Sequence, residues 1–129
     1  MDGQNTILRF QNVTFNYAGG PELLRDVNFS LAPATLTFLI GPTGSGKSTL
    51  LRLCNGREKP SRGDIIALGS NISEAQGAEL AALRKRIGTV FQDLLLVDHL
   101  SVFDNVALPL RLAGHSLSAY GKDIQELLG

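Results

Sequence analysis

A glycine-rich stretch about a third of the way along the chain has the residue types and the spacing needed to bind phosphate. Residues 41–48 read GPTGSGKS, which matches the pattern G-x-x-x-x-G-K-[ST] at every fixed position. The glycines allow backbone conformations that a Cβ would forbid, so successive N–H groups can point toward one anion. The lysine adds a positive charge that can reach the β- and γ-phosphates, and the serine hydroxyl suits Mg²⁺. The stretch therefore predicts a site for a nucleoside triphosphate, with ATP and magnesium as the expected ligands.

Such a loop must be positioned by a strand before it and a helix after it. Residues 35–40 (TLTFLI) are β-branched and almost wholly apolar, which predicts a strand buried on both faces of a parallel sheet. Residues 48–54 predict a helix that ends at Gly56. This context favours a functional loop over a linker that matches the pattern by chance. The residues assigned to the nucleotide are Gly41, Gly44, Ser45, Gly46, Lys47, Ser48 and Thr49, with Ser48 also assigned to magnesium.

The rest of the chain alternates between strand and helix patterns. Apolar alternation predicts N-terminal strands, broken by a turn at 18–21, and a later strand; these cover residues 7–10, 13–17, 23–31 and 64–68. A short strand is predicted at 89–91, and helices at 77–85 and 118–128. Ser101 is the expected N-cap of another helix, which Pro109 is expected to limit. The order of these elements predicts an α/β fold.

The overall composition excludes several classes of protein. Acidic and basic residues balance at 12 each, so no electrostatic attraction to nucleic acid is expected. The single cysteine excludes an internal disulfide and is typical of a reducing compartment. The N-terminus has no signal-peptide pattern, and no apolar run reaches the ~20 residues of a membrane helix. These features predict a soluble chain that reaches a membrane only through a partner.

Beyond the loop, further residues resemble the N-terminal half of the ATP-binding cassette (ABC) ATPases. Tyr17 lies where that family places an aromatic residue against adenine, although a half-buried strand aromatic is the alternative. Residues 60–63 (PSRG) look like the family's P-x-x-G turn, and Gln92 matches its Q-loop glutamine. The resemblance implies a P-loop NTPase core with an N-terminal antiparallel β subdomain, and a chain that ends within the helical subdomain. It also implies that Tyr17 binds adenine and that Gln92 positions magnesium and the attacking water.

Within the family, residues 83–93 and 98–110 are most similar to the cell-division members, and lipoprotein-release and macrolide-export ATPases are alternatives. The resemblance implies a homodimer, bound to a membrane permease on the inner face of the cell membrane. Residues 94–97 (LLLV) are either a docking surface for that permease or part of the core, because an apolar run cannot choose between them.

The family's signature motif, Walker B aspartate, catalytic glutamate and switch histidine have no counterpart in residues 1–129. We therefore expect a partial ABC ATP-binding domain over residues 1–129, and a non-catalytic, truncated nucleotide-binding fragment is a further alternative. By itself it should hydrolyse no ATP, because Gln92 cannot act as a base near neutral pH. Apolar strands without all their neighbours should also make it poorly stable or prone to aggregation.

Overall fold

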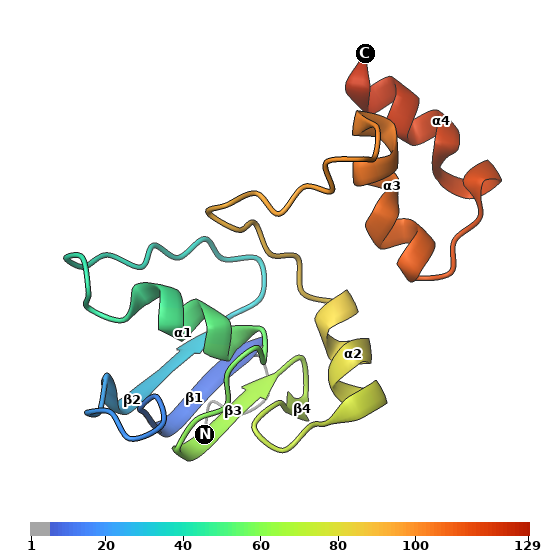
Figure 1. The fold of residues 1–129 in the computed structure, drawn as a ribbon. Coiled ribbons are helices and arrows are strands. Elements are labelled where there is room, and N and C mark those ends of the chain that lie inside the picture. Colours follow the sequence, from blue (N-terminus) through green and yellow to red (C-terminus); the bar gives the residue numbers. More distant parts are fainter. Residues whose placement is uncertain (1–5) are drawn as a thin grey trace. The chain divides into compact units, whose positions relative to one another are not determined.

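The computed structural model describes residues 6–129 and divides the chain after Ile87 into two compact units, which are described separately (Figure 1). The first unit contains a sheet with α1 (Lys47–Cys54) and α2 (Gly77–Lys85). The second unit contains α3 (Val102–Leu112) and α4 (Leu117–Leu128). None of the helices found over residues 6–129 combines the length and apolarity that crossing a bilayer requires.

The sheet of the first unit is wholly antiparallel, in the strand order β2-β1-β3-β4. Its strands are β1 (Leu8–Phe15), β2 (Leu24–Leu31), β3 (Arg62–Ala67) and β4 (Ser70–Asn71). The two short strands predicted at the N-terminus are therefore one strand, whose pairing is shifted between Phe10 and Phe15. This sheet confirms the predicted antiparallel β subdomain.

The core of the first unit lies between the sheet and the helices that cover it. Figure 1 shows α1 lying across one face of the sheet, and Leu53 of α1 is completely buried. Phe10 stacks on Phe29 across β1 and β2 with ring centroids 4.5 Å apart. The buried apolar cluster is Phe10, Val13, Phe15, Leu24, Leu53, Ile65, Ala67, Ile72 and Leu83. This cluster fixes α1, and with it the end of the glycine-rich loop, on the sheet.

The backbone around residues 60–63 (PSRG) shows why position 63 is a glycine. Gly63 has a φ of +84°, and a Cβ there would collide with the backbone carbonyls of Gln11 and Asn12. The pairing of β1 with β3 is interrupted at that point, between Gln11 and Thr14. Only a residue without a side chain allows the two strands to approach so closely while the backbone is left-handed.

Two predicted strands are wrong. Residues 35–40 and 89–91 have no regular structure, and no strand among residues 6–129 pairs with either. Their apolar side chains are open to solvent: Phe38 is 78% exposed, Ile40 89% and Val90 93%. The physical reason is that a strand needs hydrogen-bonding neighbours, which sequence pattern alone does not supply.

The second unit is a helical hairpin with its own small core. Ala107, Tyr120 and Ile124 are buried there, with Val106 and Leu110 packed against them. The predicted cap is confirmed, because the Asp104 N–H donates to Ser101 Oγ at 3.0 Å. The hydrogen bonds from the Ser101 hydroxyl and from Arg111 lower the pKa of Asp104 below its ordinary value.

The predicted stop at Pro109 is wrong, because α3 continues through it to Leu112. Proline removes one backbone donor, but its fixed φ suits a helix. The apolar packing of α3 on α4 offsets the lost hydrogen bond. The helix ends instead before Gly114, which has a φ of +87°.

Candidate functional site

The glycine-rich loop runs from residue 41 directly into α1. Gly44 and Gly46 have φ values of +82° and +97°, which other residues rarely adopt. A Cβ at Gly46 would lie 2.9 Å from Leu24 Cδ2, so the loop also packs tightly against the start of β2. Gly46 therefore suits the left-handed backbone conformation, and a side chain at that position would also require Leu24 to shift.

The start of α1 is suited to an anion. Gly46 is the N-cap residue and provides no side-chain hydrogen bond, and the first turn carries no acidic residue. The first helical hydrogen bond runs from the Leu50 N–H to the Gly46 carbonyl at 2.9 Å. The N–H groups of the preceding residues have no partner within a helix, and the helix dipole places partial positive charge there.

The ammonium group of Lys47 lies inside the loop. Its Nζ donates to the carbonyl oxygens of Gly41 at 2.6 Å and Pro42 at 2.8 Å, and to Ser45 Oγ at 3.4 Å. The loop thus holds its cation next to the N-terminus of α1, where a phosphate would be attracted by both.

Two hydroxyl groups follow on the first turn of α1. Ser48 is exposed, and within residues 6–129 its hydroxyl makes no hydrogen bond, so it fits the role of a magnesium ligand. Thr49 is buried, with 6% of its surface exposed, and its Oγ1 lies 3.3 Å from the Tyr17 hydroxyl.

Tyr17 is brought to the same helix from the turn after β1. Its ring meets Phe15 edge-on, with centroids 4.8 Å apart, and 43% of the residue remains exposed. Arg52 donates to its hydroxyl at 3.3 Å. Tyr17 therefore contacts two residues of α1, the helix whose first turn carries Lys47, and its assignment to adenine stays a prediction. Sequence reasoning missed Arg52, and its only signal was the i, i+3 spacing from Thr49.

Gln92 belongs to the second unit, so its assigned role stays a prediction. It is exposed, in a turn that the Leu94 N–H closes onto the Phe91 carbonyl at 3.1 Å. The leucines after it are also open to solvent: Leu94 is 65% exposed, Leu95 56% and Leu96 64%.

The segment after these leucines is fixed by Asn105 of α3. Its side-chain amide donates to the carbonyls of Val97, Leu100 and Ser101, at 3.0 to 3.2 Å, and its oxygen accepts from the Val97 N–H at 2.8 Å. A hollow of about 280 Å³ lies beside this segment, lined mainly by apolar side chains that include Leu96, Val102 and Val106. Of the three exposed leucines, Leu96 lines this hollow.

Comparison with known proteins identifies the family. The family model described as "ABC transporter" matches residues 24–129. The chain belongs to the ABC transporter family. It is 43% identical over 119 residues to the cell division ATP-binding protein FtsE of Escherichia coli, a match that covers 92% of this chain and 52% of that protein. It is 41% identical to the methionine import ATP-binding protein MetN of Aliivibrio fischeri, covering 87% of this chain and 33% of that protein.

A solved ABC structure has the same fold. The dimeric, post-hydrolysis state of the ATP-binding cassette MJ0796, bound to ADP and Pi, superposes with a TM-score of 0.83 at 30% identity. The match covers 92% of this chain and 54% of that one. The predicted α/β fold class is thus confirmed, and the chain spans about half the length of this relative and of FtsE.

Proposed function

We propose that residues 1–129 are part of an ABC ATP-binding domain that binds ATP and Mg²⁺ through the glycine-rich loop. The observation that carries this proposal is the position of Lys47, whose ammonium lies inside a loop that opens onto the uncapped N-terminus of α1. A cation and a helix dipole that point at the same place provide an anion site.

Each assigned residue has a role in this proposal. The backbone of residues 41–46 and Lys47 bind the β- and γ-phosphates, and Thr49 borders them. Ser48 and Gln92 hold Mg²⁺, which would neutralise phosphate charge when bound. Tyr17 stacks on adenine, and Gln92 also orients water in the whole protein. We assign ATP hydrolysis to the whole protein, as part of the same proposal, and not to residues 1–129 alone.

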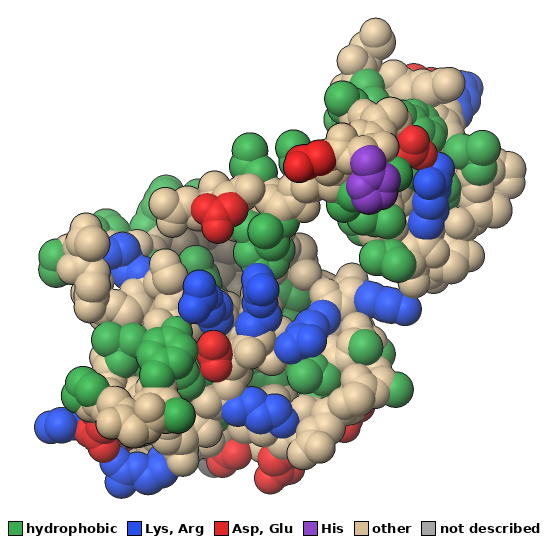
Figure 2. Space-filling model, viewed as in Figure 1, with side chains coloured by type: hydrophobic (Ala, Val, Ile, Leu, Met, Phe, Trp, Pro, Cys, Tyr) green, Lys and Arg blue, Asp and Glu red, His purple; other side chains and the backbone are tan. Residues whose placement is uncertain are grey.

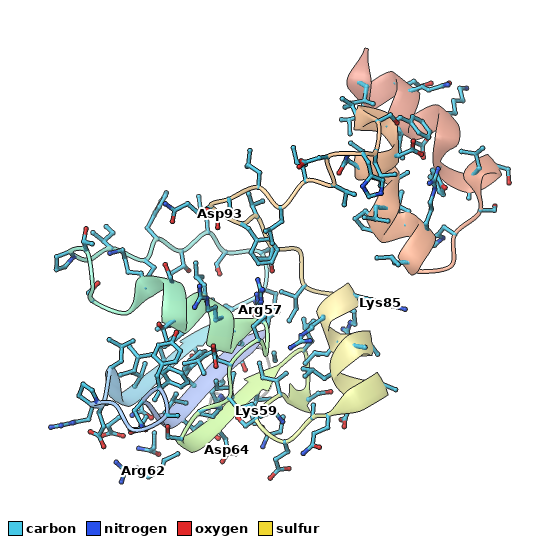
Figure 3. The ribbon with its side chains drawn as sticks, in the orientation of Figure 1. Arg57, Lys59, Arg62, Asp64, Lys85 and Asp93 are labelled. Carbon is cyan, nitrogen blue, oxygen red and sulfur yellow. The ribbon has the colours of Figure 1, made fainter. Side chains whose placement is uncertain are left out.

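The test is a titration of a fluorescent ATP analogue into the parent chain and Lys47→Ala. Losing charge-assisted hydrogen bonds worth roughly 1.5–3 kcal/mol should weaken binding by about 10- to 150-fold. Lys85→Ala is the matched control, since it removes the same charge from the exposed end of α2 (Figure 3). Equal affinities for Lys47→Ala and the parent would refute the site.

We further propose that the subunit acts in cell division, as a homodimer bound to an FtsX-like permease on the inner face of the membrane. The identity to FtsE supports this role, and the exposed leucines Leu95 and Leu96 offer the docking surface. Leu95→Glu and Leu96→Glu should abolish co-purification with a co-expressed FtsX-like permease and leave ATP affinity unchanged. Leu112→Glu, at a position 68% exposed on α3, is the control and should retain the permease. Unfolding of the second unit by the Leu95 and Leu96 variants would show that these leucines are core.

A methionine importer is the second candidate, because the identity to MetN is nearly as high. Parallel co-expression with an FtsX-like permease and with a methionine-importer permease separates the two. Stable association with the importer permease alone would overturn the cell-division role and leave the ATP site intact.

A further inference from the structure

A hydrogen-bonded chain of side chains connects the turn after β1 to the outer surface of α1. Arg52 donates from Nη1 to the Tyr17 hydroxyl at 3.3 Å, and that hydroxyl lies 3.3 Å from Thr49 Oγ1. Tyr17 and Thr49 are 32 residues apart in sequence, so only the fold brings them together. The Arg52 contact has no part in the phosphate site described above.

The hydrogen bonds that link Arg52, Tyr17 and Thr49 can all run in one direction, from donor to acceptor. A guanidinium can only donate, so the phenol oxygen accepts from Arg52 and its hydrogen is available for Thr49 Oγ1. Thr49 is buried, which makes it a firm anchor, whereas Tyr17 is 43% exposed. Phe15 contacts the ring edge-on at the same time. The Tyr17 ring is thus held at its hydroxyl and by Phe15 while part of it stays open to solvent.

We propose that Arg52 is a positioning residue, which holds the Tyr17 ring in the orientation that stacks on the base of a nucleotide bound at the loop. This inference rests on the proposed ATP site. A ring already fixed in its binding orientation loses less conformational freedom when the base arrives, so the complex is tighter. Arg52 acts on the base through Tyr17 and touches no phosphate.

The position of Arg52 along α1 separates it from the phosphates. It lies in the last turn of the helix, whereas the loop and Lys47 are at the first. Five residues of helix correspond to roughly 7.5 Å along the axis. Arg52 therefore lies at the opposite end of α1 from the proposed phosphate site, and its bond to Tyr17 is the contact to test.

The experiment compares a ligand that has a base with one that lacks it. ATP and inorganic tripolyphosphate, each with Mg²⁺, are titrated calorimetrically into the parent chain, Arg52→Gln, Tyr17→Phe and the double variant. Losing one net hydrogen bond of roughly 0.5–1.5 kcal/mol corresponds to a 2- to 12-fold weakening of ATP binding. We expect that loss in each variant, no larger loss in the double variant, and unchanged affinity for tripolyphosphate. Arg52→Lys, which keeps a donor, should recover part of the ATP affinity.

A control variant, Lys85→Gln, tests whether losing any positive charge from the first unit weakens anion binding. Lys and Arg side chains gather on the face of the first unit seen in Figure 2, so any lost charge could weaken anion binding. Lys85→Gln removes one charge from the end of α2 and should change neither affinity.

Each contrary result has a distinct meaning. If Arg52→Gln weakens both ligands equally, Arg52 acts on the phosphates and the positioning role is wrong. If its effect adds fully to that of Tyr17→Phe, or if ATP affinity is unchanged, the coupling is wrong while the ATP site stands. If the parent chain binds neither ligand, the proposed function fails, and this inference fails with it.

Discussion

Replacing Gly63 by alanine should destabilise the first unit severely, although the added group is a single methyl. The new Cβ would lie 2.5 Å from the carbonyl carbon of Asn12 and closer still to the carbonyl oxygens of Gln11 and Asn12. These are backbone atoms of β1, so they cannot rotate away as a flexible side chain could. To make room, β1 and β3 must separate where their pairing is already interrupted.

The expected loss of unfolding free energy in Gly63→Ala has two parts, and a matched variant can separate them. A left-handed conformation costs an L-residue roughly 1–2 kcal/mol. Overpacking adds about 1–3 kcal/mol, which gives a total of roughly 2–5 kcal/mol. Gly69 has nearly the same φ, +85° against +84°, and nothing lies within 4 Å of the Cβ that alanine would add. Gly69→Ala therefore measures the conformational part alone.

The assay is urea unfolding of the parent chain and both variants at low protein concentration, followed by far-ultraviolet circular dichroism. We expect Gly69→Ala to lower the free energy of unfolding by about 1–2 kcal/mol, and Gly63→Ala by about 1–3 kcal/mol more. Because whole domains are stable by only ~5–15 kcal/mol, the loss in Gly63→Ala is a large share of that stability and should lower the urea midpoint well below that of the parent chain. Equal losses in the two variants would show that the close approach of β1 and β3 is not what requires glycine at 63.

Other predictions concern single side chains. Burial raises the pKa of the Cys54 thiol to about 12. At pH 8 it should therefore react with iodoacetamide at least roughly a hundredfold more slowly in the folded chain than in urea, and comparable rates would contradict its burial. The same shift should reduce stability as the pH rises above the ordinary thiol value of 9.0, an effect absent in Cys54→Ala. The lowered pKa of Asp104 stabilises the second unit above the ordinary value of 3.8, and this is lost as the pH falls below it. Asp104→Asn should remove that part of the acid unfolding curve, and identical curves would refute the assignment. Phe38→Ser should reduce aggregation, measured by light scattering, because Phe38 is 78% exposed. Unchanged scattering would show that residues 35–40 are not the segment that causes aggregation.

Local patterns were sufficient where the structure depends on neighbours in sequence. Residues 41–48 were predicted to form a loop that runs into a helix, and the structure has that loop with Lys47 inside it; the anion site itself stays a prediction. The Ser101 cap and the bounds of α2 also agree, because capping and helical periodicity are decided within a few residues.

Tertiary structure decided what local pattern could not. Residues 35–40 carry a strand pattern but form no strand, since pairing needs a neighbour from elsewhere in the fold. Pro109 lies within α3 because packing on α4 outweighs one missing donor. The β4 hairpin escaped prediction because two residues are too few to show periodicity.

The site divides in the same way. The sequence by itself predicted which residues would bind phosphate, because consecutive backbone groups and the start of the next helix form the loop. It could not show that Arg52 and Thr49 hold Tyr17, since side chains 32 and 35 residues apart meet only once β1 and α1 have packed on a common core. Long-range contacts of this kind depend on the whole hydrophobic cluster, so they belong to the tertiary structure and leave no local signal in the sequence.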